Sequence, residues 1–182
     1  MSMFNKQSIA TVNSSDFTAL NAAPLEEFTS RLADVFEHSP WVAQRVGHLR
    51  PFSDVGQLHH AMVSAVQQAS TTEQLDLLRA HPALAGKEAQ QGTLTAASEQ
   101  EQARAGLNAL SPAEMKCITG LNAAYLGRHG FPFIACVGLH TKQGLILEFG
   151  RRLGNSTESE VQEALSQIYA IAQLRLITLF AS

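Results

Sequence analysis

The chain has 182 residues, of which 45% are hydrophobic and 16% charged, and its formal net charge is -3. This length and composition predict one domain spanning residues 1–182 with a single core, and they exclude an intrinsically disordered chain. The charge balance leaves no basic surface for nucleic acid. No apolar run approaches the roughly 20 residues that cross a bilayer, and the N-terminus carries no basic-then-apolar signal pattern.

The two cysteines, Cys117 and Cys136, stand apart in the sequence and form no CxxC pair. This usage is typical of a reducing compartment and gives no zinc signature. The chain ends in Phe180-Ala181-Ser182, which is not a peroxisomal address of the Ser-Lys-Leu type. We therefore expect a cytoplasmic protein without a metal, nucleic acid or membrane as partner.

Apolar residues recur at three- and four-residue steps over most of the chain, which is the period of one helical face. The pattern predicts helices over residues 20–36, 41–46, 54–68, 71–80, 96–110, 112–127, 142–153 and 158–179. We expect an all-α fold, a single-domain helical bundle of about seven to nine helices. Residues 1–13 are expected to form a loosely ordered N-terminal arm.

Caps and breaks predict where several of these helices begin and end. Thr71 or Thr72 is the expected cap of a helix that ends at His81, because the proline after His81 disfavours helical backbone at the residue before it. Residues 86–95 are expected to form a polar loop. Residues 131–139 are a continuous apolar run that could be a buried strand; since no partner strand is evident, we expect an extended buried segment between helices.

His81 is the histidine whose surroundings favour a functional role. Seven histidines are present, and none belongs to an H-E-x-x-H pattern. His81 follows a leucine-rich helix and precedes a loop, so its imidazole has a rigid base and can open to a pocket. The alternative is a structural histidine that interacts with the dipole at the C-terminal end of the helix.

Polar side chains on two other predicted helices are further candidates. Ser98, Glu101 and Gln102 are spaced i, i+3 and i+4, so they share one face. The alternative for Ser98 and Glu101 is a capping box, Ser-x-x-Glu, at a helix start. Arg175 interrupts an apolar helical run, and Arg152 follows another arginine; a guanidinium can clamp a carboxylate, but a buried one can equally be paired inside the fold.

Seven sequence blocks, in order along the chain, resemble the OHCU (2-oxo-4-hydroxy-4-carboxy-5-ureidoimidazoline) decarboxylases. The blocks are Ser39–Trp41, His81–Gly86, Ser98–Leu107, Leu121–Tyr125, Gly130–Ile134, Arg152–Asn155 and Ile171–Leu176. The resemblance implies an all-helical homodimer that acts without metal or organic cofactor in urate degradation. Its substrate is the small ureidoimidazoline acid OHCU, and its products are (S)-allantoin and carbon dioxide.

The resemblance also implies which residues form the site. The catalytic residues are His81, Glu101 and Arg175, with Arg152 as the competing arginine. The substrate-binding residues are Pro82, Ser98, Glu99, Gln100, Gln102, Phe133, Ile134, Ala135, Cys136 and Val137. The chain departs from the family at two positions, since Ala83 replaces a frequent acidic residue and His129 a frequent aromatic one, and neither change removes a catalytic group.

Two other functions compete with a decarboxylase. One is a helical binding module without turnover, whose polar blocks are caps and interfaces. The other is a hydrolase of a related cyclic ureide, in which His81 and Glu101 activate water. The product separates the two enzymes, because hydrolysis adds water whereas decarboxylation releases carbon dioxide.

Overall fold

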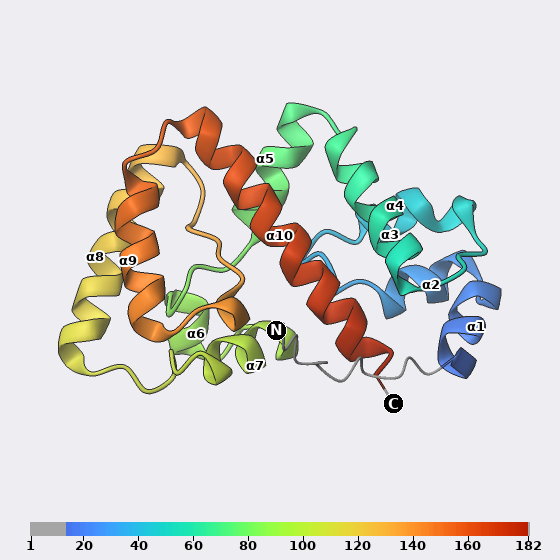
Figure 1. Ribbon diagram of the computed structural model, residues 1–182, viewed down its shortest axis with the longest axis horizontal. Helices are drawn as coiled ribbons and strands as arrows, with labels where there is room; N and C mark the ends of the chain where they lie inside the picture. Colours follow the sequence, from blue (N-terminus) through green and yellow to red (C-terminus); the bar gives the residue numbers. More distant parts are fainter. Residues whose placement is uncertain (1–13, 182) are drawn as a thin grey trace, which may run out of the picture.

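The computed structural model describes residues 14–181, so the expected N-terminal arm, residues 1–13, lies outside the described residues (Figure 1). The described chain forms ten α-helices and two 3₁₀-helices. They are α1 (Ser14–Ala22), α2 (Leu25–Arg31), α3 (Trp41–Val46), η1 (Gly47–Leu49), α4 (Val55–Gln67), α5 (Thr71–Ala80), α6 (Lys87–Gln91), α7 (Ala96–Arg104), α8 (Pro112–His129), η2 (Val137–Leu139), α9 (Lys142–Leu153) and α10 (Thr157–Leu179). The all-α prediction is confirmed. The ten helices exceed the expected seven to nine for two reasons. The helix predicted over residues 20–36 is divided into α1 and α2 at Pro24, the N-cap of α2, and the short α6 lies where a loop was expected.

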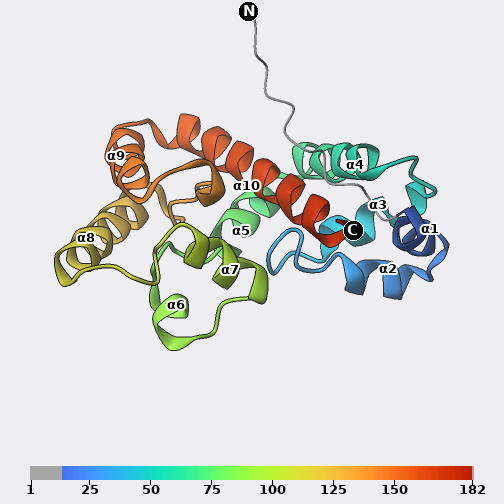
Figure 2. The same ribbon diagram turned by 60° about the horizontal axis from the view of Figure 1, so that its bottom comes forward.

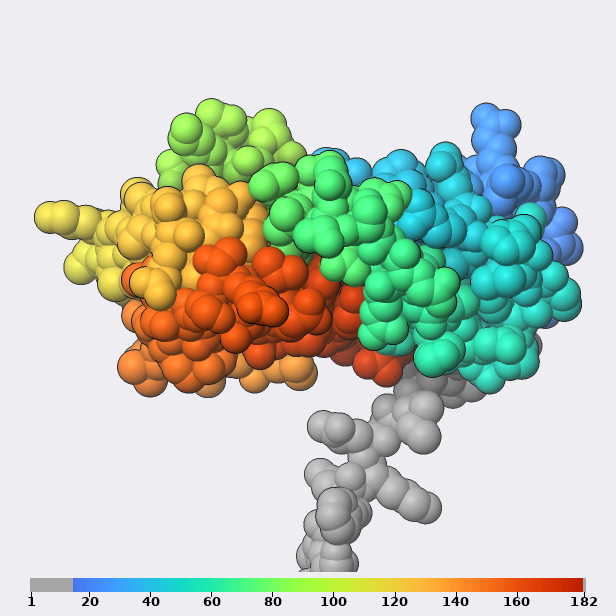
Figure 3. All heavy atoms as spheres, turned by 90° about the horizontal axis from the view of Figure 1, so that it is seen from above, coloured from blue at the N-terminus to red at the C-terminus, as the bar shows by residue number. Residues whose placement is uncertain are grey.

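Helix α10 joins the two ends of the molecule. It packs against α4, α5 and α8, and Figures 1 and 2 show it running between the α1–α4 group at one end and α8 and α9 at the other. Figure 3 shows the same arrangement from above, with the N-terminal helices (blue) at one end of the long axis and α8 and α9 (yellow to orange) at the other. With 23 residues, α10 is long enough to place side chains in both halves.

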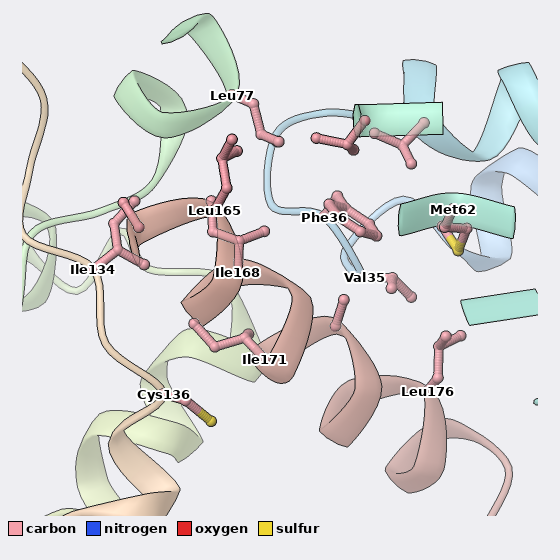
Figure 4. Close-up of a cluster of buried hydrophobic side chains, with 14 of the residues drawn as sticks. Val35, Phe36, Met62, Leu77, Ile134, Cys136, Leu165, Ile168, Ile171 and Leu176 are labelled. Carbon is pink, nitrogen blue, oxygen red and sulfur yellow. The ribbon is translucent and has the colours of Figure 1, made fainter. Parts of the chain in front are cut away.

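The core surrounds the buried face of α10. Figure 4 shows Leu165 and Ile168 of this helix among side chains from α5 and from the segment before α3, including Leu77 and Phe36. All four side chains are at most 3% exposed. Burying a side chain of this size stabilises a fold by roughly 1.5–3 kcal/mol. Apolar packing of this kind therefore holds α10 in place.

The cap of α5 differs from the prediction. Ser70 is the N-cap, and its hydroxyl accepts a hydrogen bond from the backbone N–H of Glu73. The carboxylate of Glu73 in turn accepts from the backbone N–H of Ser70 at 2.9 Å, which completes a capping box. Thr71 and Thr72 were therefore the wrong candidates, because both already lie inside the helix. The predicted C-terminal end is confirmed, since His81 has extended backbone with ψ of 133°.

Two predicted boundaries around the site were also wrong. The expected polar loop over 86–95 contains the short helix α6. The helix expected over 96–110 ends at Arg104, because Gly106 takes a left-handed φ of 75° and a Schellman motif follows. In this motif the N–H of Leu107 donates to the carbonyl of Gln102 at 3.0 Å. Because α7 ends at Arg104, the chain changes direction at Gly106.

Residues 131–136 form the expected extended segment, after which η2 begins. All of these residues except Pro132 are buried. The N–H of Cys136 donates to the side-chain oxygen of Gln167 on α10 at 2.9 Å, which replaces the partner that a sheet would supply. Within the described part of the chain, no helix is both long and apolar enough to cross a membrane.

Candidate active site

Arg175 on α10 is the centre of a buried polar cluster. Its side chain is 6% exposed. Nε and Nη2 donate to the two carboxylate oxygens of Glu101, each at 2.8 Å, which is a bidentate ion pair. Nη1 donates to the backbone carbonyl of Asp34 at 2.7 Å, and Nη2 also contacts the hydroxyl of Ser98 at 3.0 Å. The guanidinium is thus held from two other segments of the chain, α7 and the turn after α2.

Glu37 supplies a second carboxylate to Arg175. It lies in the turn between α2 and α3, its side chain is 1% exposed, and its Oε2 is 3.0 Å from Nη2 of Arg175. Thr95 donates to it at 2.6 Å, and Ser98 donates as well. Burial raises the pKa of Glu37, but the hydrogen bonds from Ser98 and Thr95 and the charge of Arg175 outweigh it and bring the pKa below its usual value. Glu37 is therefore charged at neutral pH.

The capping-box alternative for Ser98 and Glu101 is wrong. Thr95 is the N-cap of α7 and accepts from the backbone N–H of Ser98. Since the cap lies three residues earlier, Ser98 is inside the helix and its hydroxyl is free to reach Glu37. Gln102 shares the buried face, as the spacing predicted. The predicted polar face of α7 therefore points into the cluster.

Gln102 holds the loop that follows His81. Its side-chain oxygen accepts from the N–H of Ala85 at 2.9 Å, at a position where Ala85 has a left-handed φ of 47°. Asn122 on α8 donates to the carbonyl of the preceding Leu84 at 2.9 Å. Two side chains from different helices thus fix the backbone of residues 84–85, and with it the direction of the turn that begins at His81.

His81 has an electrostatic environment that keeps it neutral. Burial lowers its pKa to about 4; the negative charge of Glu37 opposes this shift, and the positive charges of Arg175 and His38 add to it. The imidazole makes no side-chain hydrogen bond to another described residue. A neutral, uncommitted imidazole at neutral pH can accept a proton from a bound molecule.

A cavity of about 350 Å³ opens beside this cluster. Glu101 and Arg175 line it, together with apolar side chains of α7, η2 and α10 such as Ala97, Val137 and Leu174. This is a pocket for a small molecule, with an apolar wall and a few convergent polar groups. Charged side chains at the cavity also include Arg31, Asp34 and Arg104.

The predicted substrate-binding residues divide into three groups. Gln100, Cys136 and Val137 line the cavity with Glu101 and Arg175. Pro82, Ser98, Gln102, Phe133, Ile134 and Ala135 are buried behind it or in the core. Glu99 is exposed, and neither it nor His81 is among the residues that line the cavity.

The thiol of Cys136 is unsuited to nucleophilic chemistry. Burial raises its pKa, and the negative charge of Glu101 raises it further. Since the thiolate is the reactive form, Cys136 serves the cavity as a small apolar wall. Figure 4 shows it on the segment that faces α10.

Arg152 belongs to a different cluster from Arg175. Its side chain and that of Glu160 are fully buried and form an ion pair. Nη1 of Arg152 donates to the carbonyl of Ile134 at 2.6 Å, and its guanidinium lies over the ring of Phe133. Of the two candidate arginines, Arg175 therefore faces the cavity, and Arg152 supports the extended segment from behind.

Sequence reasoning missed three residues that organise the site. Glu37, Thr95 and Asn122 contact it only through the tertiary fold. A signal existed for Glu37, because it directly follows Val35 and Phe36, two residues with core spacing, and a carboxylate at such a position needs a partner. Across residues 14–181, no group of three or more His, Cys, Asp or Glu side chains is placed to hold a metal ion.

Comparison with known proteins shows the family of the chain. A family model described as OHCU decarboxylase matches residues 21–177. A Haloferax volcanii protein named 2-oxo-4-hydroxy-4-carboxy-5-ureidoimidazoline decarboxylase is 40% identical over 157 residues, which are 86% of this chain and 91% of that protein. A Xenopus laevis protein with the same name is 32% identical over 165 residues, 91% of this chain and 94% of its own length.

Among solved structures, the crystal structure of (S)-allantoin synthase is similar to this chain with a TM-score of 0.73 and 30% sequence identity. The similarity covers 90% of this chain and 54% of the other. The chain thus spans about half the length of that structure, whereas it spans nearly the whole of the two relatives above.

Proposed function

The chain belongs to the OHCU decarboxylase family, and from this we propose that it converts 2-oxo-4-hydroxy-4-carboxy-5-ureidoimidazoline to (S)-allantoin and carbon dioxide in urate degradation. The observation that carries the proposal is the cavity lined by Glu101 and Arg175, with Glu37 and Ser98 bonded to the same guanidinium. A small acid of this kind matches a pocket of about 350 Å³ whose wall includes the buried guanidinium of Arg175.

The substrate's name places a hydroxyl and a carboxylate on one ring carbon. Loss of carbon dioxide breaks the bond between that carbon and the carboxylate, and the bonding electron pair remains on the ring. Donors preorganised around the developing negative charge lower the barrier. The guanidinium of Arg175 is one candidate donor. Of the backbone N–H groups of residues 133–137, that of Val137 is the other, since residues 133–135 do not line the cavity and the N–H of Cys136 is bonded to Gln167.

His81 does not line the cavity, but it is close enough to Glu37 and Arg175 to interact with their charges, and in this proposal it provides the proton transfer. Its neutral imidazole accepts the proton of the substrate's hydroxyl, which becomes the ring carbonyl of the product. The imidazolium then returns that proton to the neighbouring ring carbon, which bears the ureido group, and a second proton from water neutralises the remaining negative charge on the ring. Positioned acid and base catalysis of this kind typically contributes roughly 10² to 10⁴ in rate.

The apolar wall of the cavity favours the loss of carbon dioxide. The substrate's carboxylate is charged and the departing carbon dioxide is not, so a poorly solvated position destabilises the former relative to the latter. Val137, Ile171 and Leu174 supply such a surface next to Arg175. The guanidinium orients the carboxylate, and the apolar side chains keep water from it.

Analysis of the product tests the proposed reaction. Fresh substrate generated from urate is incubated with the protein, and the products are followed by mass spectrometry and circular dichroism. The expected result is a product lighter than the substrate by the mass of one carbon dioxide, and a circular dichroism signal from one allantoin enantiomer. A product heavier by one water would identify a ureide hydrolase, and unchanged substrate kinetics would identify a binding module.

We also propose that the enzyme is a cytoplasmic homodimer. Large apolar side chains are exposed on η2, α9 and the C-terminal half of α10, including Leu139 at 67% and Leu147 at 75%. Exposed apolar surface of this kind favours association between subunits. Both cysteines are free thiols, as expected in a reducing compartment. Light scattering after gel filtration is expected to give twice the chain mass of 19.7 kDa; a single chain mass at micromolar concentration would contradict the dimer.

A further inference from the structure

Arg175 has two carboxylate partners in very different surroundings. The side chain of Glu101 is 27% exposed and lines the cavity. The side chain of Glu37 is 1% exposed and is absent from the cavity lining. One carboxylate is enough to neutralise one guanidinium, so the second is available for another task.

We propose that Glu37 is a positioning residue, the permanent counter-ion of Arg175, and that Glu101 is the exchangeable one, which leaves the guanidinium when the substrate's carboxylate arrives. This division of roles rests on the proposed decarboxylase function. The bidentate edge of Arg175, Nε and Nη2, is the edge that Glu101 occupies. A planar guanidinium binds any carboxylate on that edge in the same two-bond geometry, so the substrate can take the place of Glu101.

Glu37 has the contacts that a fixed counter-ion needs. Thr95 and Ser98, on consecutive turns at the start of α7, donate to its two carboxylate oxygens. Arg175 is also held by the carbonyl of Asp34, three residues before Glu37. With these bonds intact, Arg175 keeps its position and its charge balance after Glu101 has left.

The backbone next to Glu37 supports this role. His38 takes a left-handed φ of 53°, and the only other non-glycine residue in residues 14–181 with positive φ is Ala85, in the loop after His81. A left-handed conformation is unfavourable for a non-glycine residue. Such conformations persist where the surrounding structure imposes them, often at functional sites. Here His38 directly follows Glu37, and Ala85 lies in the loop after His81 and donates its N–H to Gln102.

Glu37→Gln and Glu101→Gln are expected to have opposite effects on substrate binding. Without the charge of Glu37, Glu101 becomes the sole counter-ion and leaves Arg175 less readily, so KM rises roughly 10- to 100-fold, the loss typical of a hydrogen bond to a charged group. Without its charge, residue 101 binds the Nε and Nη2 edge of Arg175 less strongly and competes less with the substrate's carboxylate. In Glu101→Gln, KM is therefore expected to stay constant or fall, while kcat drops. If Glu37 contributed only to stability, Glu37→Gln would not raise KM while Glu101→Gln leaves it constant or lowers it.

The matched control is Glu160→Gln, which also removes one buried carboxylate charge from a buried arginine. It is expected to lower thermal stability without moving KM. If Glu37→Gln does not fold, Glu37→Asp keeps the charge, shortens the side chain, and is expected to raise KM in the same direction. Circular dichroism and gel filtration verify the fold of each variant.

Binding of orotate, a stable cyclic ureide carboxylate, separates this proposal from the proposed reaction because it needs no turnover. Calorimetric titration is expected to show weaker binding to Glu37→Gln than to the wild type, and equal or tighter binding to Glu101→Gln. Turnover by the wild type tests the decarboxylase function independently. Affinity changes in the same direction for both variants, or an unchanged affinity in Glu37→Gln, would overturn the assignment of Glu37 as the fixed counter-ion.

Discussion

Nε of Arg175 lies 2.8 Å from Oε1 of Glu101, and Nη2 lies 2.8 Å from Oε2. This pair joins α10 to α7 across 74 positions of sequence in the wall of the cavity. Its parallel hydrogen bonds occupy the Nε and Nη2 edge of the guanidinium. The same edge defines how an acidic substrate would be oriented, and the expected effects of mutation follow from that geometry.

Arg175→Lys is expected to lower kcat/KM by roughly 10- to 100-fold while the protein remains folded. Lysine keeps the positive charge, but its ammonium group cannot form the two parallel hydrogen bonds of a guanidinium. Steady-state kinetics with fresh substrate measure the effect. Arg151→Lys is the control, since Arg151 forms an exposed pair with Glu148 outside the site. Wild-type kcat/KM in Arg175→Lys would show that bidentate geometry is not needed.

Arg152→Met is expected to act on stability. It leaves the buried carboxylate of Glu160 without its ion-pair partner, although Tyr125 and Asn155 still donate to it. Breaking a buried pair from one side typically costs about 3–5 kcal/mol of unfolding free energy. Urea denaturation measures the loss, and the double variant Arg152→Met/Glu160→Leu is expected to recover part of it. A loss below about 1 kcal/mol would contradict the pairing.

The free energy of unfolding is expected to fall as the pH is lowered from about 6.5 toward 4. Burial lowers the pKa of both His81 and His129 in the folded protein, His81 to about 4. In this window the unfolded chain binds more protons than the folded one, so acid favours unfolding, and the full stability is present only above the unfolded histidine pKa of about 6.5.

His129→Phe tests the contribution of one of these histidines. The ring of His129 is buried against Tyr125 and Phe131, and its Nε2 has no hydrogen-bond partner among the described residues. A phenylalanine fills the same space and takes up no proton. Urea titrations across this pH range are therefore expected to give a shallower pH dependence. An unchanged slope in His129→Phe would mean that this histidine does not contribute.

His38→Gly is expected to stabilise the protein by up to about 1 kcal/mol. The left-handed backbone at His38 costs a non-glycine residue roughly 1–2 kcal/mol, and glycine offsets part of that gain by its greater freedom in the unfolded chain. His48→Gly is the matched control. It lies in η1 without a positive φ, so the same substitution should lower stability. Chemical denaturation of both variants compares them directly, and destabilisation by His38→Gly would contradict the inferred strain.

Local patterns predicted most of the fold, because helix periods and the His-Pro stop are encoded within a few residues. The errors at α5 and α7 arose where neighbouring polar residues could each serve as the cap. At α5 Ser70 rather than Thr71 has the extended backbone that a cap requires, and at α7 Thr95 rather than Ser98 does. Spacing alone does not reveal which residue of such a pair remains outside the helix.

The site was predictable where it depends on one helix and unpredictable where it depends on tertiary contacts. The shared face of Ser98, Glu101 and Gln102 follows from helical geometry. The contact of Glu37 with Arg175 spans 138 positions, and no periodicity connects them. The choice between Arg152 and Arg175 also required the fold, since both interrupt amphipathic helices and each has its own buried glutamate partner.

The most direct test of decarboxylation at this cavity is the rate of carbon dioxide release from fresh substrate, with wild type, Glu101→Gln and His81→Asn at equal folded concentration, against a protein-free control. The wild type is expected to exceed the control clearly, His81→Asn to be slower than the wild type by roughly 10² to 10⁴, and Glu101→Gln also to be slower than the wild type. Release by the wild type at the protein-free rate would contradict the proposed function, and wild-type rates in both variants would place the chemistry elsewhere.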